Sequence, residues 1–261
     1  HPDGIDLGCA APMAPAGLAN AYAEAVGELP AYLGGHGYFP TGLPHLQAEV
    51  ARGFEERGLP TDPAQVIITP GALSGAAIVA QALARRGDRV LVESPVYPNA
   101  TLALRNAGGR LIGAPVDPEG WDLAAVGAQL RQVRPALAYL VPDFQNPTAA
   151  TLPESRRREL IELCAKHKVL IVEDCTYSEL YYYDNPPPPS MFALSNGEGV
   201  LKLGTFSKII ATGLRAGWVQ GRKDYIEAMG RVRFDMGTSP ILNHMLANFI
   251  GSGQLEPHIE K

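Results

Sequence analysis

The sequence predicts one α/β unit wound around a central sheet. Of its 261 residues, 46% are hydrophobic and 19% are charged, so the chain can bury a large core. Short runs rich in β-branched residues alternate with segments whose apolar residues recur at helical spacing. Such alternation is typical of folds in which helices cover a wound sheet.

The expected strands are short apolar runs bounded by turn residues. They cover residues 66–69, 89–93, 110–114, 136–140, 169–173 and 200–204. Helical periodicity predicts helices over residues 76–84, 99–106, 122–132 and 153–167. The proline-rich segment 185–189 predicts a rigid, solvated loop, for which the role of a spacer is sufficient.

Charge and cysteine content narrow the class of protein. The net charge of −5 and the pI of about 5.7 argue against binding to nucleic acid or to a membrane surface, because both need a basic footprint. No apolar run approaches the ~18 residues that cross a bilayer. Three scattered cysteines, Cys9, Cys164 and Cys175, favour small buried side chains in a reducing cytoplasm over disulfides or a metal site. The expected partner is therefore a small molecule.

Polar residues follow three of the expected strands. Asn146 comes after the strand at 136–140, Asp174 directly after 169–173, and Lys208 after 200–204. Because reactive groups gather beyond the carboxyl ends of strands in such sheets, we expect these side chains to lie close together. The turn Gly71-Ala72-Leu73 follows the first strand and opens a helix, whose free N–H groups suit a phosphate.

These residue types meet the chemical demands of one cofactor, pyridoxal phosphate. The amine of Lys208 can bond the cofactor aldehyde, and a buried carboxylate such as Asp174 keeps the ring nitrogen protonated. Tyr177, three residues after Asp174, and the amide of Asn146 can both donate to the phenolic oxygen of the ring. The two donors would stabilise the phenolate.

The phosphate of the same cofactor has its own candidates. Arg215 lies seven positions after Lys208 and would grip a phosphate together with Thr205 and the amides of the helix opened by Gly71. Each of these residues alone more often has a structural role, such as a cap or a solvated side chain. Their succession as Asn, Asp, Lys and Arg in the loops after successive strands favours a shared site.

Five longer motifs are spread along nearly the whole chain. They are Tyr38-x-x-Thr41-Gly42-Leu43-Pro44-x-Leu46, Val92-Glu93-Ser94-Pro95-Val96-Tyr97, Pro142-x-x-Gln145-Asn146-Pro147-Thr148, Val172-Glu173-Asp174, and Gly204-Thr205-Phe206-Ser207-Lys208 continuing to Arg215-x-Gly217-Trp218. Together they resemble the fold-type-I pyridoxal-phosphate family, class I and II aminotransferases. Within that family the chain resembles the 2-aminoadipate and kynurenine aminotransferases and the aminotransferase-like domain of MocR-type transcription regulators. The resemblance implies a three-layer αβα fold with a mostly parallel central sheet.

The resemblance also implies roles for individual residues. Lys208 would form the aldimine (Schiff base), Asp174 would pair with the pyridine nitrogen, and Tyr177 would act with them as a catalytic residue. The other cofactor-binding positions implied are Tyr97 on the ring face, Asn146 at the phenolic oxygen, and, around the phosphate, Gly71, Ala72, Leu73, Thr205, Ser207, Arg215 and, from the partner subunit of an obligate homodimer, Tyr38. The expected partners are an amino acid and a 2-oxo acid.

The sequence departs from the family pattern at several positions. Ala72 and Leu73 stand where relatives often carry Ser and Gln, Ala149 replaces a glycine, and Cys175 replaces an acidic residue. We expect an N-terminal arm over residues 1–35 and a cofactor-binding large domain over 36–261. The small C-terminal domain, with the arginine that binds the substrate carboxylate, would lie beyond Lys261.

The implied activity is transfer of an amino group between an amino acid and a 2-oxo acid through Lys208. Other functions use the same residues. The stretch Leu33 to Pro40 also suits the effector-sensing domain of a MocR-type regulator, which would need a basic winged-helix domain before His1. A pyridoxal-phosphate lyase, decarboxylase or oxidase would share the scaffold, and a structural domain without cofactor would not need the retained site residues.

Overall fold

The computed structural model describes residues 10–32, 34–182 and 186–260. The helices are α1 (Leu18–Glu28), α2 (Pro44–Glu56), α3 (Ala72–Leu83), α4 (Pro98–Asn106), α5 (Leu123–Val133), α6 (Glu154–His167), α7 (Met191–Leu194), α8 (Lys223–Val232), α9 (Pro240–Gly251) and α10 (Leu255–Ile259). Short 3-10 helices cover Leu29–Tyr32, Pro63–Gln65 and Thr212–Leu214. The strands are β1 (Val66–Thr69), β2 (Arg89–Ser94), β3 (Arg110–Asp117), β4 (Gly120–Trp121), β5 (Leu137–Leu140), β6 (Leu170–Asp174), β7 (Val200–Thr205) and β8 (Gly217–Gln220).

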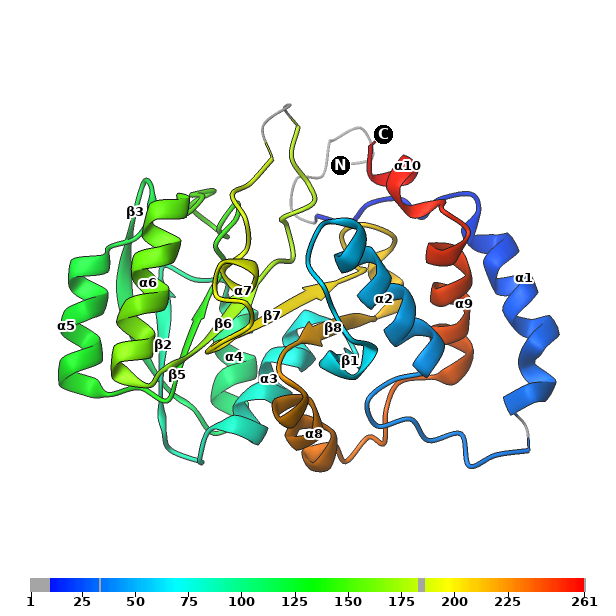
Figure 1. The fold of residues 1–261 in the computed structure, drawn as a ribbon, viewed down its shortest axis with the longest axis horizontal. Helices are drawn as coiled ribbons and strands as arrows, with labels where there is room; N and C mark the ends of the chain where they lie inside the picture. The colour runs from blue at the N-terminus through cyan, green and yellow to red at the C-terminus, as the bar shows by residue number, and fades with distance from the viewer. Residues whose placement is uncertain (1–9, 33, 183–185, 261) are drawn as a thin grey trace, which may run out of the picture.

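One eight-stranded sheet runs through the molecule, in the order β1-β8-β7-β6-β5-β2-β3-β4 (Figure 1). The central strands β7, β6, β5, β2 and β3 pair in parallel. Antiparallel pairs occur where β8 lies between β1 and β7, and where β4 joins β3. The predicted fold class, with a mostly parallel central sheet between helices, is confirmed.

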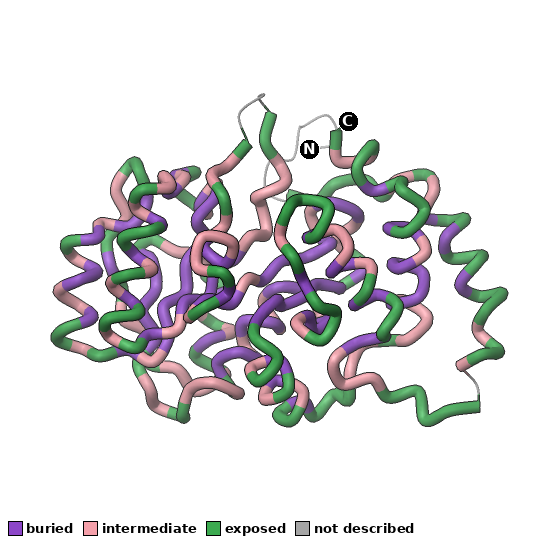
Figure 2. The backbone as a smooth tube through the Cα atoms, in the orientation of Figure 1, coloured by how far each residue is buried: buried purple, intermediate pink, exposed green. Residues whose placement is uncertain are grey.

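Helices cover both faces of the sheet, and alternate residues of each strand supply the two contacts. In β1, Val66 and Ile68 pack in a core with α1, α2 and α9, whereas Ile67 packs in a second core with α3 and α8. A third core joins α5, α6 and α7 to the sheet on the same face as α2. The buried strands and the exposed outer sides of α1 and α5 are visible in Figure 2.

The predicted elements are present, with ends displaced by a few residues. The largest difference among the helices is α3, which begins at Ala72 rather than residue 76 because its first turn follows Gly71 directly. Asp174 is the last residue of β6 rather than the residue after it. The four-residue strand β8 was not predicted, because its sequence Gly-Trp-Val-Gln is too short for a periodic signal. Within the described ranges, no helix is both long and apolar enough to cross a membrane.

Candidate active site

The strand order brings the predicted site residues to one edge of the sheet. Strands β1, β5, β6 and β7 all run in the same direction, so their carboxyl ends meet there. Asp174 ends β6 and pairs with Leu203 of β7, whose last residue is Thr205. The loop after β5 carries Asn146, and β1 leads through Gly71 into α3. The edge therefore holds both the side chains predicted to bind the cofactor ring and those predicted to bind its phosphate.

Asp174 is held rigidly at this edge. Its side chain is buried, with one carboxylate oxygen accepting a 2.5 Å hydrogen bond from the hydroxyl of Tyr139. The other oxygen accepts from the amide and the hydroxyl of Thr176, at 2.9 and 2.5 Å. Burial raises the pKa of Asp174, and these hydrogen bonds oppose the rise because they favour the carboxylate. A protonated ring nitrogen would supply the missing positive charge.

Tyr139 was not predicted from the sequence as a site residue. It lies on β5, its side chain is fully buried, and burial together with the charge of Asp174 raises its pKa well above the ordinary value. Tyr139 therefore stays protonated and donates to Asp174. Its only signal in the sequence is a hydroxyl in an otherwise apolar strand, which does not indicate its partner 35 residues away.

Tyr139→Phe is expected to weaken cofactor-dependent activity by about 10- to 100-fold. The lost hydrogen bond to a charged group is worth about 1.5–3 kcal/mol, and without it the pKa of Asp174 rises further. The measurement is steady-state kcat as a function of pH. In the variant, the rising limb of this pH profile should move to higher pH. Tyr225→Phe on α8, where the ring packs beside Arg222, is the matched control. An unchanged pH profile would show that Tyr139 has only a packing role.

The proposed ring-binding residues beyond Asp174 are also neighbours. The amide of Asn146 donates to the hydroxyl of Tyr177 over 3.4 Å. Burial raises the pKa of Tyr177, with smaller effects from Asp174 and from Tyr97 at the start of α4. Tyr97 accepts a 2.8 Å hydrogen bond from the Asn99 amide. The side chains of Asp174 and Tyr97 are thus both close enough to Tyr177 to influence its pKa.

The proposed phosphate-binding residues form a second group. Arg215 donates to the hydroxyl of Ser207 over 3.1 Å, and that hydroxyl is 3.0 Å from the hydroxyl of Thr205. Arg215 has the left-handed φ of +47°, and its guanidinium lies against Gly71. A Cβ on Gly71 would approach the Nη2 atom of Arg215 to 2.7 Å, and Gly71 has a φ of +90°. Only glycine lets the loop and the guanidinium approach this closely.

The first turn of α3 faces this group with free donors. Gly71 is the N-cap residue of α3 and has no side chain that could accept a hydrogen bond. Within the described residues, the amides of Ala72 and Leu73 therefore lack a side-chain acceptor. Positive charge from the helix end adds to that of Arg215. Backbone amides, two hydroxyls and a guanidinium are a donor set that fits a phosphate ester.

Lys208 directly follows Ser207 in the loop between β7 and β8. Its Nζ atom donates a 2.6 Å hydrogen bond to the carbonyl of Ala10. None of the contacts in the described ranges joins its amine to Asp174, Asn146 or Tyr177. Ala10 lies eight residues before α1 begins at Leu18, and the sequence does not indicate its contact with Lys208.

A buried network supports the loop that carries Asn146. One oxygen of Glu93, at the end of β2, accepts from the amide of Val141 at 3.1 Å and the side chain of Gln145 at 3.2 Å. Gln145 in turn accepts from the amide and hydroxyl of Thr148, at 2.9 and 2.7 Å. In the sequence, Glu93 and Gln145 were noted only as positions of family motifs. In the structure, their hydrogen bonds hold this loop in place.

Ala149, where relatives carry glycine, adopts a left-handed φ of +59°. A side chain in this conformation costs about 1–2 kcal/mol. The amide of Ala149 nevertheless closes the loop by donating to the carbonyl of Gln145. The substitution therefore leaves the turn in place at a cost in stability.

Glu93→Gln is expected to remove a pH dependence of stability. Burial raises the pKa of Glu93 from 4.5 to about 8. Its contribution to stability is fully present below the unfolded-state pKa and is lost as pH rises through 8, because the unfolded chain ionises first. Glutamine can accept the same two hydrogen bonds without ionising. The unfolding free energy of the variant relative to the native protein should therefore rise by about 1–4 kcal/mol between pH 5 and 8.

Urea unfolding at pH 5, 6.5 and 8 measures this difference. The control is Glu227→Gln, an exposed change on α8 beside Arg231. A difference for Glu93→Gln that stays constant over the pH range would contradict the expectation.

Comparisons with known proteins identify the family. The family model for aminotransferase class I and II matches residues 15–258. The chain belongs to this family. Its members use pyridoxal phosphate, so family membership implies the cofactor that the sequence predicted. The donor set around Gly71 and the buried carboxylate of Asp174 fit that group.

Individual relatives include both enzymes and regulators. A 2-aminoadipate transaminase of Thermus thermophilus is 34% identical over 217 residues, covering 81% of this chain and 53% of the relative. An uncharacterized HTH-type transcriptional regulator of Bacillus subtilis is 32% identical over 222 residues, covering 84% and 46%. The chain thus spans about half the length of these curated relatives.

A solved structure shows the same fold. The crystal structure of alpha-aminoadipate aminotransferase from Thermus thermophilus, complexed with N-(5′-phosphopyridoxyl)-L-leucine, matches with a TM-score of 0.80 and 30% identity. The match covers 95% of this chain and 64% of that chain.

Proposed function

We propose that this chain binds pyridoxal phosphate through Lys208 and serves an aminotransferase that moves an amino group between an amino acid and a 2-oxo acid. One observation carries the proposal. The buried carboxylate of Asp174 and the phosphate-type donors around Gly71 and Arg215 lie at the same sheet edge, with Lys208 in the loop after β7. Pyridoxal phosphate is a ligand that uses all three features: a buried carboxylate for its ring nitrogen, donors for its phosphate and an amine for its aldehyde.

The residues of the chain would divide the work. When bound, pyridoxal phosphate supplies a ring that stabilises negative charge on the substrate Cα. Asp174 keeps the ring nitrogen charged, and Asn146 and Tyr177 donate to its phenolic oxygen. Arg215 and Ser207 fix the phosphate. Lys208 would hold the aldehyde carbon, and its amine would be the base that accepts a proton from the substrate Cα.

A single-turnover experiment tests the reaction type. The protein loaded with pyridoxal phosphate is mixed with one amino acid at a time, beginning with 2-aminoadipate and aromatic amino acids, without a 2-oxo acid. Transamination predicts equal amounts of 2-oxo acid and pyridoxamine phosphate. Amine or ammonia release with the cofactor unchanged would instead indicate a decarboxylase, lyase or oxidase.

Ligand sensing is the second candidate, favoured by the similarity to a transcriptional regulator. In that case an amino acid would change the absorbance of the bound cofactor and would yield no stoichiometric 2-oxo acid. The same experiment therefore separates the two functions. The arginine expected beyond Lys261 and the boundary between residues 35 and 36 remain predictions, as does a cytoplasmic location.

We also propose a homodimer in which Tyr38 reaches the phosphate site of the partner subunit. Tyr38 is 65% exposed, and a bridge between Phe39 and Gly237 places it beside a segment with the exposed side chains of Phe234 and Met236. Such a patch is costly to leave in water. Phe234→Asp should shift the sedimentation coefficient from dimer to monomer, whereas a native protein that sediments as a monomer would refute the proposal.

A further inference from the structure

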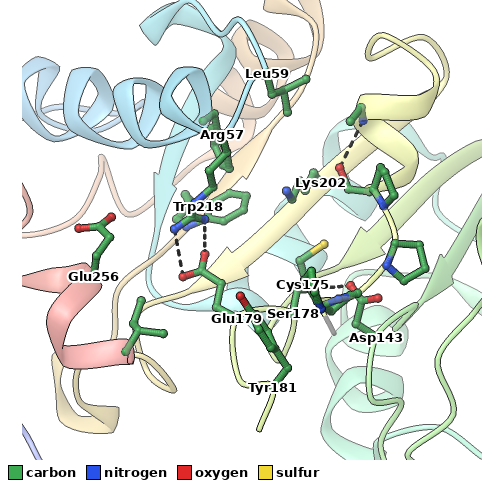
Figure 3. Close-up of a pocket in the computed structure, with 18 of the residues that line it drawn as sticks. Arg57, Leu59, Asp143, Cys175, Ser178, Glu179, Tyr181, Lys202, Trp218 and Glu256 are labelled. Atoms are coloured by element: carbon green, nitrogen blue, oxygen red, sulfur yellow. Dashed lines mark hydrogen bonds and ion pairs between the residues drawn. The ribbon is translucent and has the colours of Figure 1, made fainter. Parts of the chain in front are cut away.

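A cavity of about 720 Å³ lies on the face of the sheet that carries α2 and α7, apart from the candidate active site. It opens between the core that includes α2 and the core that includes α7, over β6, β7 and β8. Figure 3 shows Arg57 and Leu59 on one side of it and Cys175 and Ser178 on the other, with Lys202 and Trp218 between. None of the residues proposed to hold the cofactor lines this cavity.

Lys202 points into the cavity from the middle of β7. Its neighbours Leu201 and Leu203 face the other side of the sheet, where they pack in the core with α3. Its ammonium group lies 5.0 Å from the centre of the Phe54 ring. The carboxylate of its cross-strand neighbour Glu173 is already occupied by the amides of Met191 and Phe192, at 2.9 and 2.8 Å.

The other charges near the centre of the cavity are neutralised. Asp143 forms a buried ion pair with Arg157 and accepts a 2.5 Å hydrogen bond from Ser178. Arg57 pairs with Glu179 at 2.7 Å. Glu256 and Glu260 are exposed at the rim, where water screens them. Burial raises the pKa of Glu173, and the charge of Lys202 opposes that rise, but within the described ranges no carboxylate forms an ion pair with the Lys202 ammonium. Lys202 is therefore a half-buried cation without a direct salt bridge to any described residue.

The walls beside Lys202 are aromatic. The rings of Phe54 and Trp218 meet edge to face, with centroids 4.9 Å apart at 79°. Leu59 and Pro188 add apolar surface. We propose that this cavity binds a small aromatic carboxylate, whose carboxylate group pairs with Lys202 and whose ring packs on Trp218. A charge-assisted contact and an apolar wall are the usual combination in small-molecule sites.

The cavity and the candidate active site share one short loop. Asp174 and Tyr177 belong to the active site, whereas Cys175 and Ser178 line the cavity. A ligand that contacts Cys175 and Ser178 acts on the backbone that positions Asp174. Occupancy should therefore change the absorbance of bound pyridoxal phosphate, although binding itself does not depend on the proposed transamination.

Titration with 3-phenylpropionate tests the proposal, because this carboxylate has neither an amino nor an oxo group. The full chain is followed by tryptophan fluorescence and by calorimetry, since Trp218 lines the cavity and the other tryptophan, Trp121, is buried elsewhere. We expect saturable binding with a Kd of about 0.1–10 mM, reasonable for so small a ligand. Lys202→Met should weaken binding by about 10-fold or more, and Lys202→Arg should retain it.

Two controls make the result specific. Lys223→Met removes an exposed lysine that pairs with Asp62 and should leave the affinity unchanged. The neutral amide 3-phenylpropanamide should bind at least about 10-fold more weakly than the acid. Thermal melting checks that the native protein and Lys202→Met are equally folded. Equal affinities of these two proteins for 3-phenylpropionate would overturn the proposal, as would the absence of saturable binding.

Discussion

Lys208→Ala is expected to abolish covalent attachment of pyridoxal phosphate and to reduce transamination by at least about 10³-fold. In the proposed function the amine is the nucleophile for the cofactor aldehyde, and proton transfer by a positioned base is itself worth about 10²–10⁴-fold. Lys208 stands alone in this role, since no other lysine lies in the loop between β7 and β8. The loss should be in kcat, with little change in fold.

Borohydride reduction followed by mass spectrometry measures the attachment. The native protein should gain the mass of one reduced cofactor on the peptide that contains Lys208, and the variant should gain none. Lys223→Ala, at the start of α8, is the control and should label normally. An undiminished level of labelling in Lys208→Ala would contradict the proposal that this lysine bonds the cofactor.

Asp174→Asn is expected to lower the rate of the amino-acid half-reaction by about 10- to 100-fold or more. Asparagine keeps the shape of the side chain but removes the negative charge that pairs with the ring nitrogen, a contact worth about 1.5–3 kcal/mol. The hydroxyl of Tyr139 can accept as well as donate, so the amide can still be accommodated. The fold should therefore survive the change.

Stopped-flow absorbance of the half-reaction measures this effect at saturating amino acid. Asp224→Asn on the surface, which disturbs only the pair with Arg222, is the matched control. A rate within about 3-fold of the native value, against the 10-fold loss expected from one charged hydrogen bond, would show that Asp174 is a structural cap for Thr176 rather than a ring partner.

Much of the fold could be predicted because its signals are local. The central strands are short, mostly apolar runs, and α5 begins where the side chain of Asp122 caps two amides. The strand β8 had no such signal, and its place between β1 and β7 depends on pairing with residues about 150 positions away. Close contacts such as Gly217 against the backbone of Gly204 and Gly71 arise only from that pairing.

By itself the sequence determined that the residues proposed to bind the cofactor follow strands, because motif spacing and strand periodicity are properties of neighbouring residues. Tertiary structure alone decided what holds them. Tyr139 reaches Asp174, Glu93 braces the loop of Asn146, and Ala10 lies over Lys208 because the order of strands in the sheet brings distant segments together. Local periodicity carries no information on that order. The same holds for Lys202, which looks like an ordinary strand lysine until the packing of α2 and α7 leaves it facing a cavity beside the ring of Phe54.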